Sequence, residues 1–359
     1  MLRTLMLVSV SLLFFSSASG AEESSNNSGS TGYDKGFYVK SSNQKFDLTV
    51  NGRVQGRATY QYDKKNELGL TLPAARLGFK GHALDQRFSY NIQLGFDNAV
   101  PSLKEFSANF DIFPYGIQFK AGYSTSVGYS WLEGVSSGKQ DFVGRSKVYS
   151  EFSLGSLVGF SFHNGNQKGI NWDIGIYEAG PSALSGKRLG LALGSISYNY
   201  GGIDSSTETD FKGGDLRMSA TLGGFIKSQI VDWNFVGYGA SLGALAKFYG
   251  TTVNTGIYLG EPEANPMLVD GKTEQKVSKE SMQIGALLQA GHIFQKRYGV
   301  GVRYGLLSGA AKVTTQHEVL GSLSLYAFQH NLKLQMDGGV NIKKDSVAPK
   351  IEAQIQYAF

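Results

Sequence analysis

From Phe46 to the last residue, apolar and polar side chains alternate in segments of about ten residues. In the clearest segment, seven apolar side chains share one parity: Phe46, Leu48, Val50, Val54, Ala58, Tyr60 and Tyr62. A helix would scatter these side chains around its circumference, whereas a strand places them on one face. Because the pattern recurs along the chain, it predicts an all-β fold.

Alternation alone is also typical of a soluble β-sandwich. Three features favour a membrane barrel instead. The segments are long enough for tilted strands to cross a bilayer, Tyr and Phe gather at segment ends, and the polar faces carry charged residues that suit a wet interior. We therefore expect a transmembrane antiparallel β-barrel with an even number of strands, about sixteen and within 14–18. Between Leu193 and Ile196 the alternation slips, which predicts a bulge there.

The N-terminal region predicts export. Arg3 precedes an apolar run from Leu5 to Phe15, and small residues follow at Ala18-Ser19-Gly20, which is typical of a cleavable signal peptide at residues 1–20. Residues 21–44 are polar and low in complexity, so we expect a flexible leader there and the barrel over residues 45–359. The absence of Cys fits a fold whose stability comes from a closed barrel in lipid.

The chain ends in a strand pattern with a terminal aromatic residue. Ile351, Ala353, Ile355, Tyr357 and Phe359 alternate with polar residues. This resembles the C-terminal signal of outer-membrane proteins, which the barrel-assembly machinery recognises. The resemblance implies that Tyr357 and Phe359 act as an assembly signal and that the chain lies in the outer membrane of a Gram-negative bacterium, in contact with its lipid.

A second resemblance covers the first half of the expected barrel. The stretch from Phe119 to Gly165 is similar to the phosphate-selective porin O and P family, whose aromatic-x-x-Arg-Ser element matches Phe142, Arg145 and Ser146. The segments ARLGFKG and NWDIGIYEAG are similar to other strands of that family. The resemblance implies a sixteen-stranded homotrimer that passes anions, with loops folded into each pore. We accordingly expect the loop near residues 124–146 to constrict a pore.

Eight basic side chains are candidates for the pore lining: Arg53, Arg57, Arg76, Lys80, Arg87, Lys120, Arg145 and Lys147. Basic residues along a low-dielectric wall would concentrate anions. However, Asp47, Asp97, Glu105, Asp111 and Asp173 are expected on the same inner surface. Two interpretations stay open, a general porin with balanced charges and an anion-preferring porin. The net charge of +5 is too small to suggest a nucleic-acid partner.

Enzyme motifs are weak in this sequence. GASLG (Gly239 to Gly243) has the spacing of a serine-hydrolase elbow, but it lies in an alternating segment where that motif requires a strand, a turn and a helix. The five His residues are far apart, and no metal or cofactor motif occurs. We expect passive diffusion of small hydrophilic solutes without catalysis or cofactor. An outer-membrane hydrolase and a structural barrel with a closed lumen remain the alternatives.

Overall fold

The computed structural model describes residues 29–63, 65–125, 129–130, 134–165, 168–181, 188–229, 235–260, 282–309, 315–344 and 346–359. Residues 1–28 lie outside this part, so the expected signal peptide stays a prediction. Residues 261–281 also lie outside it. The described residues contain no helix long and apolar enough to cross a membrane.

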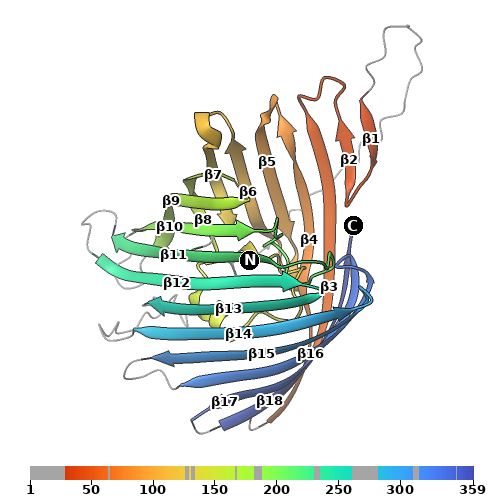
Figure 1. The fold of residues 1–359 in the computed structure, drawn as a ribbon, viewed down its shortest axis with the longest axis vertical. Helices are drawn as coiled ribbons and strands as arrows, with labels where there is room; N and C mark the ends of the chain where they lie inside the picture. The colour runs from red at the N-terminus through yellow and green to blue at the C-terminus, as the bar shows by residue number, and fades with distance from the viewer. Residues whose placement is uncertain are drawn as a thin grey trace, which may run out of the picture.

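Sixteen antiparallel strands, β3 to β18, form one closed barrel (Figure 1). Each strand pairs with the next along the chain, and β18 pairs with β3 to close the circle. The expected all-β barrel and its strand number are thereby confirmed. The strands are β3 Asp47–Asp63, β4 Lys65–Ala83, β5 Asp85–Gly95, β6 Ser102–Phe110, β7 Gln118–Thr125, β8 Ser156–His163, β9 Gly169–Pro181, β10 Arg188–Tyr200, β11 Arg217–Gln229, β12 Phe235–Phe248, β13 Thr251–Gly260, β14 Gln283–Phe294, β15 Tyr298–Gly309, β16 Gln316–Phe328, β17 Leu332–Lys343 and β18 Ser346–Ala358.

The alternation in the sequence becomes the two faces of the barrel wall. On β18, Ile351 and Ile355 are 51% and 53% exposed on the outside, whereas Glu352 and Gln354 are each 4% exposed on the inside. The same division holds around the barrel, because successive side chains of a strand point to opposite faces. An apolar outer belt over a closed hydrogen-bonded barrel is what a bilayer requires, since lipid satisfies no backbone polar group.

Two short strands precede the barrel, β1 (Ser30–Tyr33) and β2 (Phe37–Lys40). They form an antiparallel hairpin, and β2 pairs with the first residues of β3, beside the C-terminus (Figure 1). The expectation of a flexible leader over residues 21–44 therefore differs from the structure for its second half. The alternating Tyr33, Phe37 and Val39 give this hairpin its strand character.

Part of the barrel interior is apolar. Inward side chains of the central strands, among them Leu191, Leu193 and Phe225, pack against Tyr129, Val135 and the short helix α2 (Lys147–Phe152). This corrects the bulge expected between Leu193 and Ile196. The β9–β10 and β10–β11 pairings run through these positions without a shift. Here the strand has apolar residues on both faces, which hides the alternation although the register is regular.

Candidate functional site

Two connections fold into the barrel interior from opposite ends. The first inner segment, residues 134–155, follows β7, and the second inner segment, residues 201–216, follows β10. Because β7 to β10 are successive antiparallel strands, β7 and β10 end at opposite rims. The second segment starts from the rim at which β18 ends, and the first starts from the other rim.

The first inner segment crosses the barrel and binds the far wall through its backbone carbonyls. The donors are inward side chains of β3, β15, β17 and β18, and together they fix the path of residues 138–144 across the lumen. The bonds run from Arg57 to the carbonyl of Val143 (2.7 Å), from Arg303 to Gly144 (2.9 Å), from Lys333 to Gln140 (3.0 Å) and from Gln356 to Gly138 (3.0 Å).

The second inner segment is bound in the same way by the middle strands. Nζ of Lys247 donates to the carbonyls of Thr207 at 2.6 Å and Asp204 at 2.8 Å. The hydroxyl of Thr252 donates to the carbonyl of Glu208 at 2.7 Å. The buried cation on β12 therefore serves to hold a loop and is not a lining group of an open passage.

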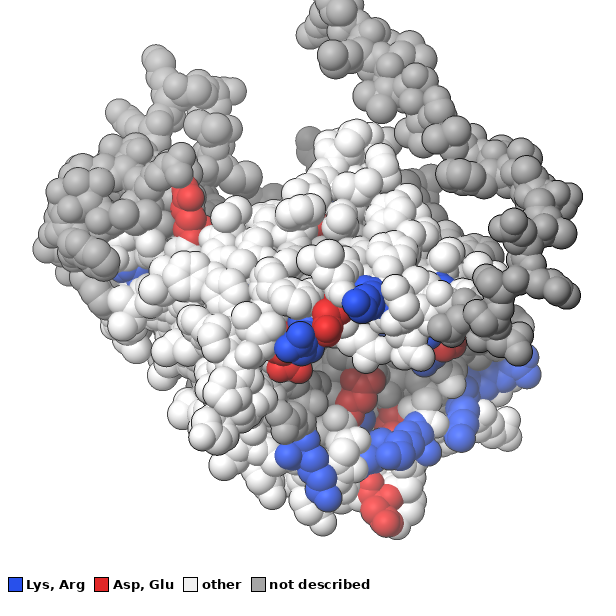
Figure 2. Space-filling view, turned by 90° about the horizontal axis from the view of Figure 1, so that it is seen from above, with Lys and Arg blue, Asp and Glu red and all other residues white. Residues whose placement is uncertain are grey.

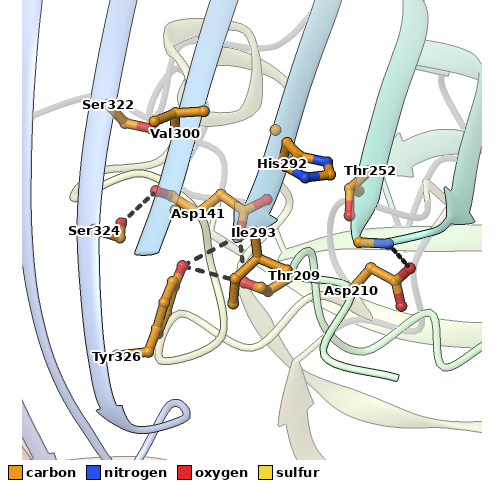
Figure 3. Close-up of a pocket in the computed structure, with 13 residues that line it drawn as sticks. Asp141, Thr209, Asp210, Thr252, His292, Ile293, Val300, Ser322, Ser324 and Tyr326 are labelled. Carbon is orange, nitrogen blue, oxygen red and sulfur yellow. Dashed lines mark hydrogen bonds between the residues drawn. The ribbon is translucent and has the colours of Figure 1, made fainter. Parts of the chain in front are cut away.

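The two inner segments meet around Asp141 (Figure 3). Its carboxylate accepts a hydrogen bond from the Thr209 hydroxyl, and the Tyr326 hydroxyl lies 3.4 Å from the same oxygen. Its backbone N–H donates to Glu208 at 2.8 Å. Burial, reinforced by the charge of Glu208, raises the pKa of Asp141 to about 6. The junction is a buried polar contact between two loops, and the cavity beside it has a volume of only about 10 Å³.

The inner segments divide the lumen into a covered and an open part. Inward side chains of β12 to β18 are buried beneath them, as with Arg303 and Lys333, which are 3% and 1% exposed. On the opposite wall, the side chains of Arg76 and Lys120 keep 24% and 25% of their surface exposed. Partly exposed inward side chains therefore lie along β3 to β7, and also on β9 and β10 at Asp173, Ser195 and Ser197.

Five of the basic residues expected to line a pore lie on the inner face of β3, β4 and β7: Arg53, Arg57, Arg76, Lys80 and Lys120. Two of them bind the first inner segment, since Arg53 donates to the hydroxyl of Ser137 and Arg57 to the carbonyl of Val143, both at 2.7 Å. Acidic partners accompany several of them. Arg76 and Lys104 both contact Asp97, at 3.4 and 2.8 Å, and Lys120 lies 3.7 Å from Glu105. Burial opposes ionisation of Asp97, but the bond from Lys104 and the charge of Arg76 outweigh it and lower the pKa of Asp97.

The other three predicted basic residues lie elsewhere. Arg87 is exposed at the start of β5 and pairs with Asp85 at 3.1 Å. Arg145 belongs to the first inner segment, where it donates to the carbonyl of Val135 at 2.6 Å and lies over the ring of Tyr149. Lys147 begins α2 and lines a cavity of about 100 Å³ together with side chains of β3, β17 and β18.

Several residues that shape the lumen escaped the sequence reasoning, chiefly Glu208, Lys247, Arg303 and Lys333. Their strand parity marks the last three as inward, but parity does not reveal which inward residues a loop will cover. Figure 2 shows the resulting surface from one side, with blue and red side chains gathered together over part of it and most of the rest white.

The candidate enzyme groups occupy structural positions. Ser241 of GASLG lies within β12 and donates to the carbonyl of Tyr129. His163 contacts Asn109 at 2.8 Å, and His317 contacts Tyr304 at 2.9 Å. The described part of the chain contains no cluster of three or more potential metal ligands. The strand context of Ser241 lacks the turn that a nucleophile elbow requires.

Comparison with known proteins identifies the fold. No protein-family model and no curated protein matches the chain. Among solved structures, an anion-selective porin from Comamonas acidovorans has a TM-score of 0.60 and 15% identity, covering 87% of this chain and 99% of its own. OmpF of Salmonella typhi, in complex with daunomycin, has a TM-score of 0.62 and 13% identity, with coverages of 92% and 100%. The outer-membrane channel DcaP of Acinetobacter baumannii has a TM-score of 0.59 and 11% identity, with coverages of 87% and 97%.

At these identities the likeness concerns the fold. The neighbours are a porin, OmpF and an outer-membrane channel, and this chain shares their overall fold. Together with the apolar outer belt, the fold places the chain in the outer membrane of a Gram-negative bacterium.

Proposed function

We propose that the chain is a porin that lets small hydrophilic solutes and ions diffuse across the outer membrane. The observation that carries this proposal is the partly exposed, charged inner wall of β3 to β7. It faces the inner segments in a barrel whose inward side chains on β12 to β18, such as Arg303 and Lys333, are mostly buried. A solute passing there would keep most of its hydration and exchange hydrogen bonds with charged side chains, with no covalent step.

A modest anion preference is the second part of the proposal. Arg76, Lys104 and Lys120 outnumber their contact partners Asp97 and Glu105 on the open wall. Arg53 and Lys80 add further positive charge. The excess would raise the local concentration of anions, while the interspersed carboxylates would keep the selectivity weak. The carboxylates argue against a dedicated phosphate channel, which is not proposed.

The assembly of the channel is also proposed. We expect a homotrimer embedded in outer-membrane lipid, with Tyr357 and Phe359 as the signal for the barrel-assembly machinery. Tyr357 is 56% exposed on the outer face, where another protein can reach it. Cross-linking in native membranes would test the trimer, because a monomeric pattern would contradict it.

Single-channel recording in planar bilayers tests the proposed function. Uniform conductance steps with an anion-favouring reversal potential in a KCl gradient are expected. Conductance steps without anion preference would support the proposed porin and contradict the proposed anion selectivity. Folded protein that gives no steps would contradict the channel and favour a barrel closed by its inner segments.

A further inference from the structure

A polar cavity of about 190 Å³ lies between the inner wall of β9 to β11 and the two inner segments. None of the described residues that line it belongs to β3 to β7. Most of the strand residues that line it carry hydroxyl, amide or carboxylate groups: Asn171, Asp173, Ser195, Ser197, Asn199, Ser219 and Thr221. His163 of β8 and Trp172 of β9 also line it. The first inner segment contributes Gly134, and the second contributes Ser205.

The strand register places these polar groups side by side. Ser197 of β10 lies opposite Asn171 of β9 and Thr221 of β11. Side chains directly opposite in an antiparallel sheet have Cβ atoms about 4.5–5.5 Å apart. Hydroxyl and amide groups both donate and accept hydrogen bonds. Neighbouring side chains can therefore contact several hydroxyl groups of one solute molecule at once.

The charges of the cavity exclude other solute classes. Among the described residues that line it there is no Lys or Arg. His163 accepts a hydrogen bond at Nδ1 from the backbone N–H of Gly165 and therefore donates from Nε2 to Asn109, which is the neutral form of the ring. Asp173 is the one acidic side chain among the described lining residues, and its Oδ1 accepts no hydrogen bond from the described residues. An anion would meet this carboxyl group with no Lys or Arg among the described lining residues, and an apolar solute would leave the polar groups unpaired.

We propose that this cavity is a subsite for a neutral polyhydroxylated solute of about one sugar ring. The volume of 190 Å³ is below the roughly 300–1,000 Å³ of sites for drug-sized ligands. The solute is therefore expected to be smaller than a drug-sized ligand, about the size of one sugar ring. Asp173 accepts from one solute hydroxyl, and the side chains of β9 to β11 bind the others. The inference rests on the proposed channel and names a solute class for it.

Current block by D-glucose tests the subsite in planar bilayers. Glucose should lower the KCl current saturably, whereas glycine betaine, a neutral zwitterion without hydroxyl groups, should not. Each lost hydrogen bond should raise the half-blocking concentration about fivefold, so a double variant Ser197→Ala and Thr221→Val should raise it by more than tenfold. The matched control is Ser89→Ala with Thr49→Val, which removes one Ser and one Thr hydroxyl from the basic wall. It should leave the block unchanged.

The outcomes separate the subsite from the channel. Conducting protein without saturable glucose block, or with block that the cavity variant leaves unchanged, overturns the subsite and leaves the porin intact. Folded protein without conductance overturns the porin. In that case, saturation-transfer NMR of glucose with the folded protein decides the subsite. A transfer signal that the cavity variant abolishes supports it, and no signal from the parent protein overturns it.

Discussion

The backbone N–H of Asp141 donates to Oε2 of Glu208 at 2.8 Å, and this bond joins two loops that enter the barrel from opposite rims. The same carboxylate oxygen accepts from the side-chain amide of Gln289 on β14 at 2.9 Å. Glu208 therefore connects both inner segments to the wall. Either loop alone would leave backbone groups unpaired in the lumen, so each stabilises the position of the other.

Removing this connection should loosen the interior. Glu208→Ala leaves the N–H of Asp141 and the amide of Gln289 without their acceptor, which should lower the free energy of unfolding by about 1–3 kcal/mol. Urea unfolding in detergent micelles would measure the loss. The control is Glu151→Ala, since Glu151 is an exposed residue of α2. Equal stability of the two variants would contradict the connecting role.

Deleting the second inner segment should widen the passage. Within it, two glycine pairs flank residues 203–212: Gly201-Gly202 with φ of 70° and 67° and Gly213-Gly214 with φ of 66° and 79°, a conformation that glycine adopts without strain. Joining the pairs directly removes residues 203–212 and uncovers inward side chains of β12 and β13. Single-channel conductance should rise above that of the parent. An unchanged conductance would show that this segment does not limit the flow.

The strands could be predicted from the sequence because alternation is a local property. The alternation within β17 or within β18 alone shows which of its side chains face lipid. The closure of the barrel follows because every strand in lipid needs a hydrogen-bonded neighbour on both edges. The inner segments could not be predicted in this way. Residues 201–216 contain mostly small and polar residues typical of a surface loop, and their burial depends on partners such as Lys247 and Gln289 that are distant in sequence.

The candidate site was predicted in part for the same reason. Strand parity alone places Arg53, Arg76 and Lys120 on the inner face, as it does Lys333. Only the path of the first inner segment distinguishes them, because it covers Lys333 and leaves Arg76 open. The hidden alternation near Leu193 has the same cause, since an inward apolar residue is explained only by the loop that packs on it.

Open and covered cations should respond differently to neutralisation. Arg76→Gln and Lys120→Gln should each shift the reversal potential in a KCl gradient toward cations, because Asp97 and Glu105 then lose a neighbouring positive charge. Lys333→Met should leave the reversal potential unchanged. It should instead lower the free energy of unfolding by about 0.5–1.5 kcal/mol, because the Gln140 carbonyl loses one of its two donors and keeps the other, Gln335. Selectivity changes of equal size in all three variants would contradict the division of the lumen.

The raised pKa of Asp141 predicts the pH dependence of stability. Burial and the charge of Glu208 raise the pKa from 3.8 to about 6. Between these values the folded protein binds more protons than the unfolded chain, so stability is fully present below pH 3.8 and falls as pH rises toward 6. Asp141→Asn should remove this slope, on the order of 3 kcal/mol. Urea unfolding at several pH values would measure it.

Asp97 provides the matched comparison for that experiment. The pKa of Asp97 is lowered, so its contribution is present above its unfolded pKa and is lost as pH falls. Asp97→Asn should therefore reduce the loss of stability at acidic pH, which is the opposite of the change expected for Asp141→Asn. Identical pH profiles for the two variants would show that neither carboxyl titrates as its surroundings require.

The C-terminal aromatic residues should serve both packing and assembly. Phe359 exchanges two backbone hydrogen bonds with Gly52, at 3.0 and 3.1 Å, and its ring lies where a Cβ on Gly52 would be 2.5 Å away. Gly52→Ala should therefore destabilise the β3–β18 closure in refolded protein.

Tyr357→Ala should refold in detergent like its matched control Ile351→Ala, another outward residue of β18, yet accumulate less in the outer membrane of cells. Equal accumulation of these two variants would mean that Tyr357 carries no assembly signal.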